Sequence, residues 1–122
     1  MKQLKFFLTA ISACLVFSNI QAQYTGPGAT VELYTVKKVI DNASKLDKSD
    51  KQIKVKGFVI EQINNDTFWF KDTTGKIRVE IEKKQIPDIS FNEKTEVIII
   101  GEVDYDLLEG SEIEVDSLII KQ

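Results

Sequence analysis

Residues 67–81, with the sequence TFWFKDTTGKIRVEI, have the pattern of a β-hairpin. Apolar side chains recur at every second position on both sides of DTTG, which is the spacing of two strands joined by a tight turn. Asp72 favours a turn because its carboxylate accepts hydrogen bonds from nearby amides, and Gly75 can take the positive φ that such turns often need. We predict one buried face, formed by Phe68, Phe70, Ile77, Val79 and Ile81. The opposite face carries Trp69, Lys71, Arg78, Glu80 and Glu82.

Residues 1–22 have the pattern of a secretory signal peptide. A basic head with Lys2 and Lys5 precedes an almost wholly apolar stretch at residues 6–17, and the segment ends in the small residue Ala22. We expect cleavage after Ala22 and export to the periplasm. The alternative is a lipoprotein modified at Cys14, because ISAC resembles a lipidation motif. Against it, LVF continues the apolar run at the point where lipoproteins usually become polar.

The composition of the chain after cleavage excludes several kinds of chemistry. It has 14 basic and 19 acidic residues, a net charge of −5, because Lys2 and Lys5 leave with the signal. It has neither cysteine nor histidine, so disulfides, thiolate catalysis, Cys/His zinc sites and His-dependent triads are excluded. We expect no catalytic residues, no metal site and no cofactor. Nucleic-acid binding is not expected either, since it depends on Lys and Arg against phosphate.

The remaining segments predict one helix followed by five strands. Residues 23–34 are a linker or arm, and Thr35 can cap an amphipathic helix over residues 35–45, with a polar loop to residue 52. Gly57 marks a close backbone approach or bend within the first strand. The predicted strands are residues 53–63, the two strands of the hairpin, 95–105 and 112–121, with a connection at 83–92 that holds at most one helical turn. A hundred residues with this pattern fit a mainly β fold, a five-stranded OB-fold barrel over residues 53–121 with one N-terminal helix.

Several segments resemble one known family in order and spacing. They are QYTGP at 23–27, TVKKV at 35–39, FKDTTGKIRVEI at 70–81, GEVD at 101–104 and EIEV at 112–115. The chain is similar to the bacterial OB-fold (BOF) family of periplasmic stress-tolerance proteins, the YgiW and YdeI type. That resemblance implies a small, non-enzymatic binding module tied to oxidative, metal or envelope stress. Two departures lie in loops: residues 85–87 are QIP where the family often has Trp, and the loop at 106–111 looks longer than usual.

The outer face of the hairpin is the predicted ligand site. OB folds bind ligands on their second and third strands, and here that face carries Trp69, Lys71, Arg78 and Glu80, with Lys56 on the preceding strand extending it. An indole offers stacking, and a guanidinium offers a planar fork for a carboxylate or phosphate. A small charged ligand or a sugar fits this combination. The alternative is that Trp69 is half covered and belongs to the periphery of the core.

An acidic C-terminal third raises a second possibility for function. The carboxylates of this region could attract cations, or they could form an ordinary solvated surface. They are Asp104, Asp106, Glu109, Glu112, Glu114 and Asp116. The alternative function is therefore a protein-interaction domain that modulates another envelope protein through its acidic face or a sheet edge. In either case we expect a monomer.

Overall fold

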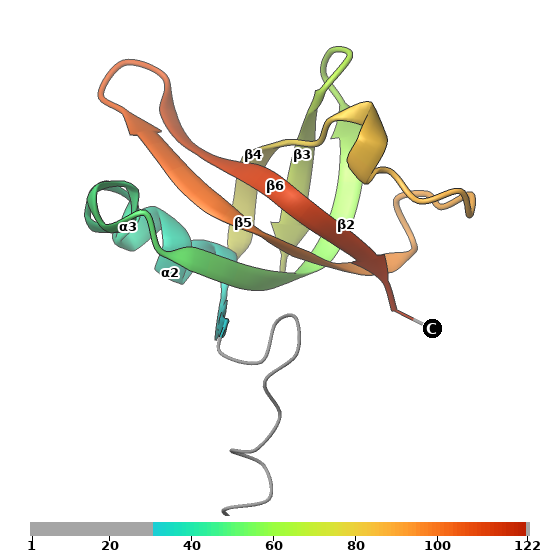
Figure 1. The fold of residues 1–122 in the computed structure, drawn as a ribbon, viewed down its shortest axis with the longest axis horizontal. Coiled ribbons are helices and arrows are strands. Elements are labelled where there is room, and N and C mark those ends of the chain that lie inside the picture. Colours follow the sequence, from blue (N-terminus) through green and yellow to red (C-terminus); the bar gives the residue numbers. More distant parts are fainter. Residues whose placement is uncertain (1–30, 122) are drawn as a thin grey trace, which may run out of the picture. The chain divides into compact units, whose positions relative to one another are not determined.

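The computed structural model describes residues 31–121, which form six strands, two helices and one 3₁₀ turn (Figure 1). In chain order these are β1 (Glu32–Tyr34), α2 (Val36–Asp41), α3 (Ala43–Ser49), β2 (Gln52–Gln62), β3 (Thr67–Asp72), β4 (Gly75–Glu80), η1 (Lys83–Gln85), β5 (Glu96–Asp106) and β6 (Gly110–Ile120). The predicted signal peptide at 1–22, the alternative lipidation site at Cys14 and residues 23–30 of the predicted linker at 23–34 lie outside the described residues. Among residues 31–121, no helix has the length and apolar character needed to cross a membrane.

The strands close into the predicted five-stranded OB-fold barrel. Their order is β1-β2-β3-β4-β6-β5, and β2 also pairs with β5, so that β2, β3, β4, β6 and β5 form a ring. Strand β2 can do this because its 11 residues take three partners: β1 and then β3 along one edge, and β5 along the other. Strand β1, which falls within the predicted arm, is an addition to the barrel and runs parallel to β2.

The hairpin contributes the centre of the barrel core, as its alternation predicts. Phe70, Ile77, Val79 and Ile81 are buried, and Phe68 packs against them half-buried. Phe70 also explains Gly57, because a Cβ at residue 57 would overlap the Lys71 carbonyl and lie 2.8 Å from the Phe70 ring. The predicted close backbone approach at Gly57 is therefore confirmed. The first strand bulges between Val59 and Glu61 instead.

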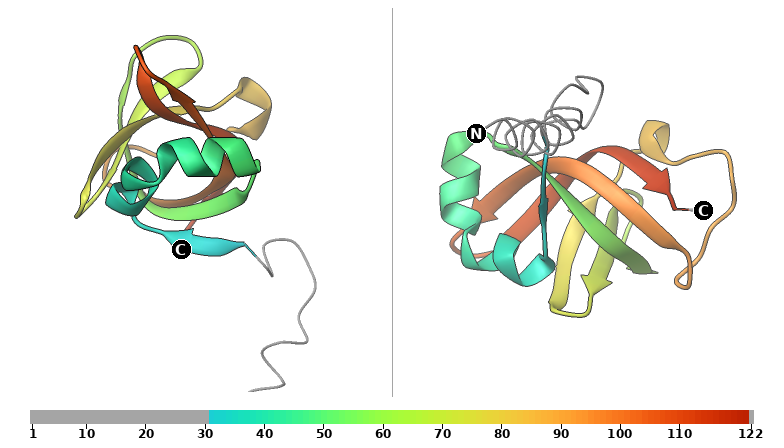
Figure 2. Two further views of the ribbon diagram at one scale, coloured as in Figure 1. Left: turned by 90° about the vertical axis from the view of Figure 1, so that its left-hand side faces the viewer. Right: turned by 90° about the horizontal axis from the view of Figure 1, so that it is seen from below.

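The predicted helix begins where expected but continues further. Thr35 is the N-cap, and its hydroxyl accepts a hydrogen bond from the Lys38 amide at 3.1 Å. The prediction of an end at residue 45 and a polar loop from residue 46 is wrong, because Leu46 is buried and extends the apolar stripe. The helix bends at Asn42, which separates α2 from α3, and ends at Asp50 in the left-handed region with φ 53°. Figure 2 shows both helices packed at one side of the barrel, with η1 toward the other.

The turn of the hairpin joins the barrel to the start of α2. The Asp72 carboxylate accepts bonds from the amides of Thr74 (2.8 Å) and Gly75 (3.2 Å) within the turn, and from the Val36 amide (2.9 Å) in the helix. The Thr74 hydroxyl accepts a further bond from the Lys37 amide at 3.0 Å. These contacts satisfy amides that a helix N-terminus leaves without partners. Asp72 is therefore both the predicted turn residue and a cap for a distant helix.

Two predictions about turns are corrected by the structure. Gly75 does not take positive φ: among the described glycines only Gly110 does, with φ 86°. The Asp72 bonds shape the hairpin turn without a left-handed glycine. The loop between β5 and β6 is also short, since Asp106 pairs with Gly110 and leaves a three-residue turn. The connection after β4 contains the single helical turn η1, as predicted.

Candidate functional site

Trp69 and Arg78 face each other across the hairpin on the outer side of the barrel. They are direct register partners, and the Lys76 ammonium lies 4.6 Å from the centre of the Trp69 ring. Both Trp69 and Arg78 are half-buried. Beside them is a hollow of about 300 Å³, which we call the hairpin hollow. Its walls include Ile40, Trp69, Lys76, Arg78, Glu109 and Ser111.

Arg78 ties the hairpin to the β5–β6 turn. Its guanidinium donates a hydrogen bond to the backbone carbonyl of Glu109. The turn is shaped in addition by Asp106, whose carboxylate accepts bonds from the amides of Leu108 (2.7 Å) and Glu109 (3.0 Å). The same two bonds lower the pKa of Asp106. Arg78, which the sequence analysis assigned to a ligand site, is therefore also engaged in holding a loop.

The predicted basic residues divide between two places. Lys71 lies directly across the hairpin from Lys76, so two ammonium groups accompany Trp69 and Arg78 on one face. Lys76 was not among the predicted site residues, although strand parity places it on that face. Lys56 lies at the turn end of the hairpin and lines a different hollow, which shares no lining residue with the hairpin hollow.

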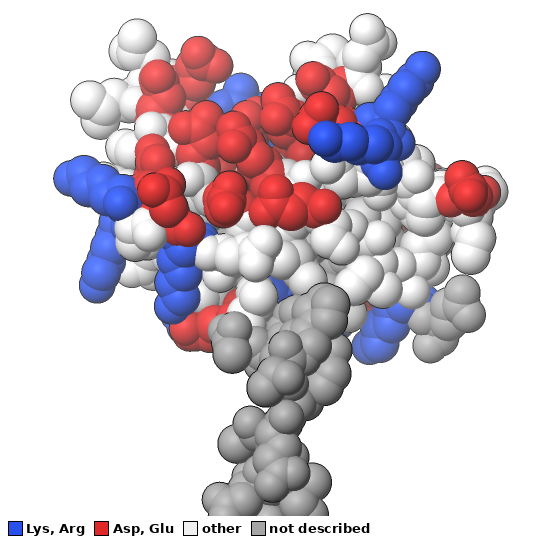
Figure 3. Space-filling model, in the orientation of Figure 1, with Lys and Arg blue, Asp and Glu red and all other residues white. Residues whose placement is uncertain are grey.

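Glu80 belongs to a cluster of carboxylates rather than to the basic group. Strand β4 pairs in parallel with β6, which sets Glu80 opposite Glu114, and β5 pairs with β6, which sets Asp104 opposite Glu112 and Glu102 opposite Glu114. We call these residues, together, the acidic face: Glu80, Glu102, Asp104, Glu112 and Glu114. Figure 3 shows acidic side chains gathered over this part of the barrel. Glu80 was predicted to join Trp69, Lys71 and Arg78 in the ligand site, but none of the ion pairs between described residues includes it.

Three carboxyls of the acidic face, those of Glu80, Glu112 and Glu114, have raised pKa values, because of burial first and of neighbouring carboxylates second. Burial raises the pKa of Glu80, and Asp66 and Glu112 raise it further. Burial also raises the pKa of Glu114, followed by the charges of Asp104 and Glu80. For Glu112, burial is again the largest cause, and Arg78 opposes it. The outer surface of the barrel is thus divided, with cations around Trp69 and carboxylates from Glu80 onward.

Sequence comparison identifies the family. The sequence model of the family described as "Bacterial OB fold (BOF) protein" matches residues 14–120. The chain belongs to the bacterial OB-fold family. Within it, the chain is 39% identical over 111 residues to the calcium-regulated OB-fold protein CarO of Pseudomonas aeruginosa, covering 89% of this chain and 90% of CarO. It is 30% identical over 114 residues to protein YgiW of Escherichia coli, covering 88% of this chain and 85% of YgiW.

Solved structures agree with this assignment. The structure of YgiW from E. coli matches with a TM-score of 0.61 at 30% identity, covering 80% of this chain and 97% of that one. Replication protein A of U. maydis, solved bound to single-stranded DNA, matches with a TM-score of 0.52 at 14% identity, covering 75% of this chain and 73% of that one. The second match shows the shared fold alone. The predicted resemblance to the BOF family is confirmed.

Proposed function

We propose that this BOF protein is a non-enzymatic binding module whose ligand is a small anion with a ring, such as an acidic or phosphorylated sugar. The observation that carries the proposal is the hairpin hollow, where Trp69, Lys76 and Arg78 meet the β5–β6 turn. This is the position at which OB folds bind ligands, between the second and third strands and the loop that joins the last two. An aromatic ring supplies a stacking surface, and the cations supply charge-assisted hydrogen bonds.

The cations favour an anionic ligand over a metal ion. Lys71, Lys76 and Arg78 all lie on the face that carries Trp69. The name of CarO links that relative to calcium regulation. Within residues 31–121, however, no three or more Asp, Glu, His or Cys side chains converge to hold a metal ion. The ligand proposed for this chain is therefore an anion.

Fluorescence tests this proposal, because Trp69 is the only tryptophan in the chain. Glucuronate, glucose 6-phosphate and neutral glucose are titrated separately into the purified protein while Trp69 emission is read. We expect the two anions to change the emission at lower concentrations than glucose does. Lys76→Gln should weaken the response to the anions several-fold, and Lys84→Gln, an equal charge change on η1, should leave it unaltered. Equal responses to all three sugars, or none, would contradict the proposal.

Export and stress tolerance are the cellular part of the proposal. The signal pattern of residues 1–22 and membership of the BOF family support a periplasmic protein that contributes to tolerance of oxidative, metal or envelope stress. Intact mass spectrometry of the exported protein should give a chain that begins at Gln23, and a lipid-modified chain that begins at Cys14 would contradict this. A deletion strain should survive peroxide, metal excess or detergent less well than its parent. Equal survival under all three treatments would argue against the stress role.

The acidic composition argues against nucleic acid as the ligand. The net charge after cleavage is −5, and the acidic face lies beside the surface on which OB folds bind single strands. We expect no measurable affinity for a single-stranded oligonucleotide at physiological salt in a polarisation assay. Submicromolar binding that weakens with added salt would show that the fold has kept this activity.

A protein-interaction domain is the second candidate, favoured by the tip of the β5–β6 turn. Leu107 and Leu108 are 87% and 96% exposed there, directly beside the hairpin hollow. Two adjacent leucines expose a large apolar area to water in a surface turn, and such an area suits contact with a protein partner. A photo-crosslinker placed at residue 107 in cells should then capture one defined envelope protein, and the same crosslinker at residue 84 should not. Capture that persists in Leu108→Asp would exclude the leucine tip as the contact.

A further inference from the structure

A second hollow lies at the edge of β2, away from the hairpin hollow. It measures about 490 Å³, within the range of about 300–1,000 Å³ typical of small-molecule sites. We call it the edge hollow. Its walls include Leu33, Tyr34, Lys38, Lys56, Phe58 and Asp72.

The edge hollow exists because β2 changes partners along this edge. β1 pairs with β2 as far as Val55, and β3 pairs with β2 from Phe58 onward. Residues 56 and 57 therefore have no paired residue on this edge of β2. The chain leaves β1 at Tyr34 and turns into α2, whose first amides are held by Asp72 and the hairpin turn. The hollow is therefore an open depression bordered by elements that are hydrogen-bonded to one another.

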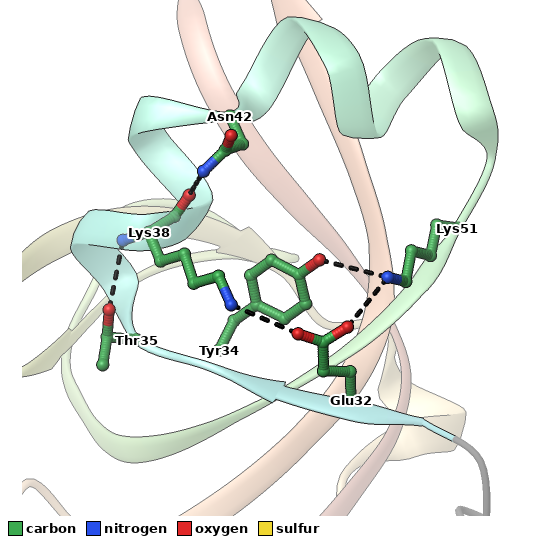
Figure 4. Close-up of polar contacts among 6 residues, drawn as sticks. All are labelled: Glu32, Tyr34, Thr35, Lys38, Asn42 and Lys51. Atoms are coloured by element: carbon green, nitrogen blue, oxygen red, sulfur yellow. Dashed lines mark hydrogen bonds and ion pairs between the residues drawn. The ribbon is translucent and has the colours of Figure 1, made fainter.

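The walls of the edge hollow are largely apolar. Leu33, which is 56% exposed, and the half-buried Phe58 contribute large apolar side chains, and Tyr34, which is only 8% exposed, borders the hollow beside them. Tyr34 is fixed in place: its hydroxyl accepts a hydrogen bond from Lys51 at 3.3 Å, and the Lys38 ammonium lies 4.5 Å from its ring centre (Figure 4). Glu32 holds both lysines, at 3.2 Å from Lys38 and 2.9 Å from Lys51. These contacts hold Tyr34 at the rim of the hollow, and the apolar area open to a ligand comes from Leu33 and Phe58.

The charged groups around the edge hollow leave one cation available. The carboxylate of Asp72 is occupied by amides of its own turn and of α2, and Glu96 forms an ion pair with Lys121 at 3.2 Å. Lys38 is paired with Glu32. Lys56 is exposed and forms no ion pair with any residue between 31 and 121. An apolar hollow with one uncommitted ammonium group at its wall is complementary to an apolar molecule with one negative charge.

We propose that the edge hollow binds a small carboxylic acid with an aliphatic or aromatic body, its carboxylate on the Lys56 ammonium and its body against Leu33 and Phe58. This site is separate from the one proposed for the acidic sugar. The sugar site uses a stacking indole and several cations on the outer barrel face, whereas the edge hollow uses apolar area and one cation. Either site can exist without the other.

The test compares an acid with its uncharged analogue. Calorimetry measures the binding of 4-phenylbutyrate and of 4-phenylbutanol to the purified protein, and amide chemical shifts locate each. We expect the acid to bind about tenfold more tightly than the alcohol, the usual effect of one charge-assisted hydrogen bond. The largest shifts should fall at Thr35, Phe58 and Thr73, which border the edge hollow, and not at Trp69.

Variants distinguish the contribution of the Lys56 charge to ligand affinity from that of the apolar walls. Lys56→Gln should abolish the preference for the acid while leaving the affinity for the alcohol, whereas Lys84→Gln should change neither. Leu33→Ala should weaken both ligands by a similar factor. Equal affinities of the wild type for acid and alcohol, or equal effects of Lys56→Gln and Lys84→Gln, would overturn the proposal. Shifts centred on Trp69 would also overturn it, since they would assign the acid to the hairpin hollow.

Discussion

At the scale of single residues, three glycines that look alike in the sequence have different reasons to be glycine. Gly57 faces the Phe70 ring and the Lys71 carbonyl, and Gly101 faces the backbone of Glu114, so a Cβ at either position meets atoms that cannot move aside easily. At Gly75 a Cβ would meet only the Val36 side chain at 3.6 Å, which is ordinary contact. Backbone contact requires glycine at residues 57 and 101, positive φ favours it at residue 110, and neither reason applies at residue 75.

Alanine substitution should therefore destabilise the protein to different degrees at these glycines. We expect Gly101→Ala to lower the free energy of unfolding by about 1–3 kcal/mol or more, because an overpacked backbone contact must be relieved by moving a strand. Gly75→Ala should change it by no more than about 0.5 kcal/mol, as for an unconstrained surface position. Urea denaturation measures both. A larger loss for Gly75→Ala than for Gly101→Ala would contradict the backbone contacts described at residue 101.

The sequence predicted contacts between residues that are close in the chain better than contacts between residues that are far apart. Alternation and DTTG were enough to place Trp69 opposite Arg78, because a hairpin register depends on neighbours in the chain. The conformation of Gly75 was not predictable, since hydrogen bonds from Asp72 define the turn without positive φ. The bond from Arg78 to Glu109 spans 31 residues, and no local pattern signals it. Lys76 could have been found by parity alone.

At the scale of elements, Asp72 links the hairpin to helix α2. Burial by itself raises the pKa of this carboxyl, but the bonds it accepts from Thr74, Val36 and Gly75 outweigh that effect and lower the pKa below its usual value of 3.8. A carboxyl with a lowered pKa in the folded state stabilises the fold above its unfolded pKa. That stabilisation is lost as the pH falls through the folded value.

Substitution of Asp72 should therefore destabilise the helix and the turn together. We expect Asp72→Ala to lower the free energy of unfolding at pH 7 by about 1–3 kcal/mol, the combined cost of a lost cap and unpaired turn amides. Asp72→Asn should lose less, because its amide oxygen still accepts a bond. Denaturation at pH 7 and at pH 3 measures both variants against the wild type. Since the wild-type carboxylate becomes protonated in acid, the deficit of Asp72→Ala should shrink at pH 3, and a constant deficit would contradict the assigned role.

The elements themselves were predicted better than their ends. The barrel strands, the cap at Thr35 and the turn η1 all follow from local signals. The part of helix α3 beyond residue 45 was missed because Lys45, Asp47 and Lys48 make the segment look like a polar loop, and Leu46 is the only buried residue of α3 after that point. Strand β1 was missed because three residues give too short a pattern, and its partner β2 lies on the far side of both helices in the sequence.

At the scale of the whole molecule, the ring of strands concentrates like charges that are far apart in the sequence. The parallel pairing of β4 with β6 brings Glu80 beside Glu114, although 33 residues separate them. The pKa values of Glu80, Glu112 and Glu114 are all raised, with burial as the largest cause and neighbouring carboxylates adding to it. A sequence shows that this third of the chain is acidic, but only the pairing of strands shows which carboxylates face each other.

The raised pKa values determine whether the stability of the folded protein rises or falls with pH. In the interval between the usual value of 4.5 and the raised folded value, the folded protein binds more protons than the unfolded chain, so its stability rises as the pH falls. Below this interval the gain is complete, and the groups with lowered pKa values, Glu32, Asp72 and Asp106, begin to lose their contribution. We expect the melting temperature to pass through a maximum in mildly acidic buffer and to fall on both sides.

Removal of one negative charge from the acidic face should stabilise the protein at neutral pH, as protonation of these carboxylates does for the wild type in mild acid. Glu114 lies opposite both Glu80 and Glu102, so Glu114→Gln relieves two like-charge contacts at once. We expect it to raise the free energy of unfolding at pH 7 and low salt by about 0.2–1 kcal/mol, the usual size of a cross-strand charge effect. Glu93→Gln makes the same change in the loop before β5 and should have almost no effect. The gain from Glu114→Gln should shrink toward zero at pH 4, because the pKa values of Glu80 and Glu114 are raised and both carboxyls are largely protonated there, and in 1 M NaCl, where the Debye length falls to about 3 Å. A gain that survives both conditions would mean that Glu114 acts through packing or helps to bind a ligand, and that repulsion across the acidic face is not what the substitution relieves.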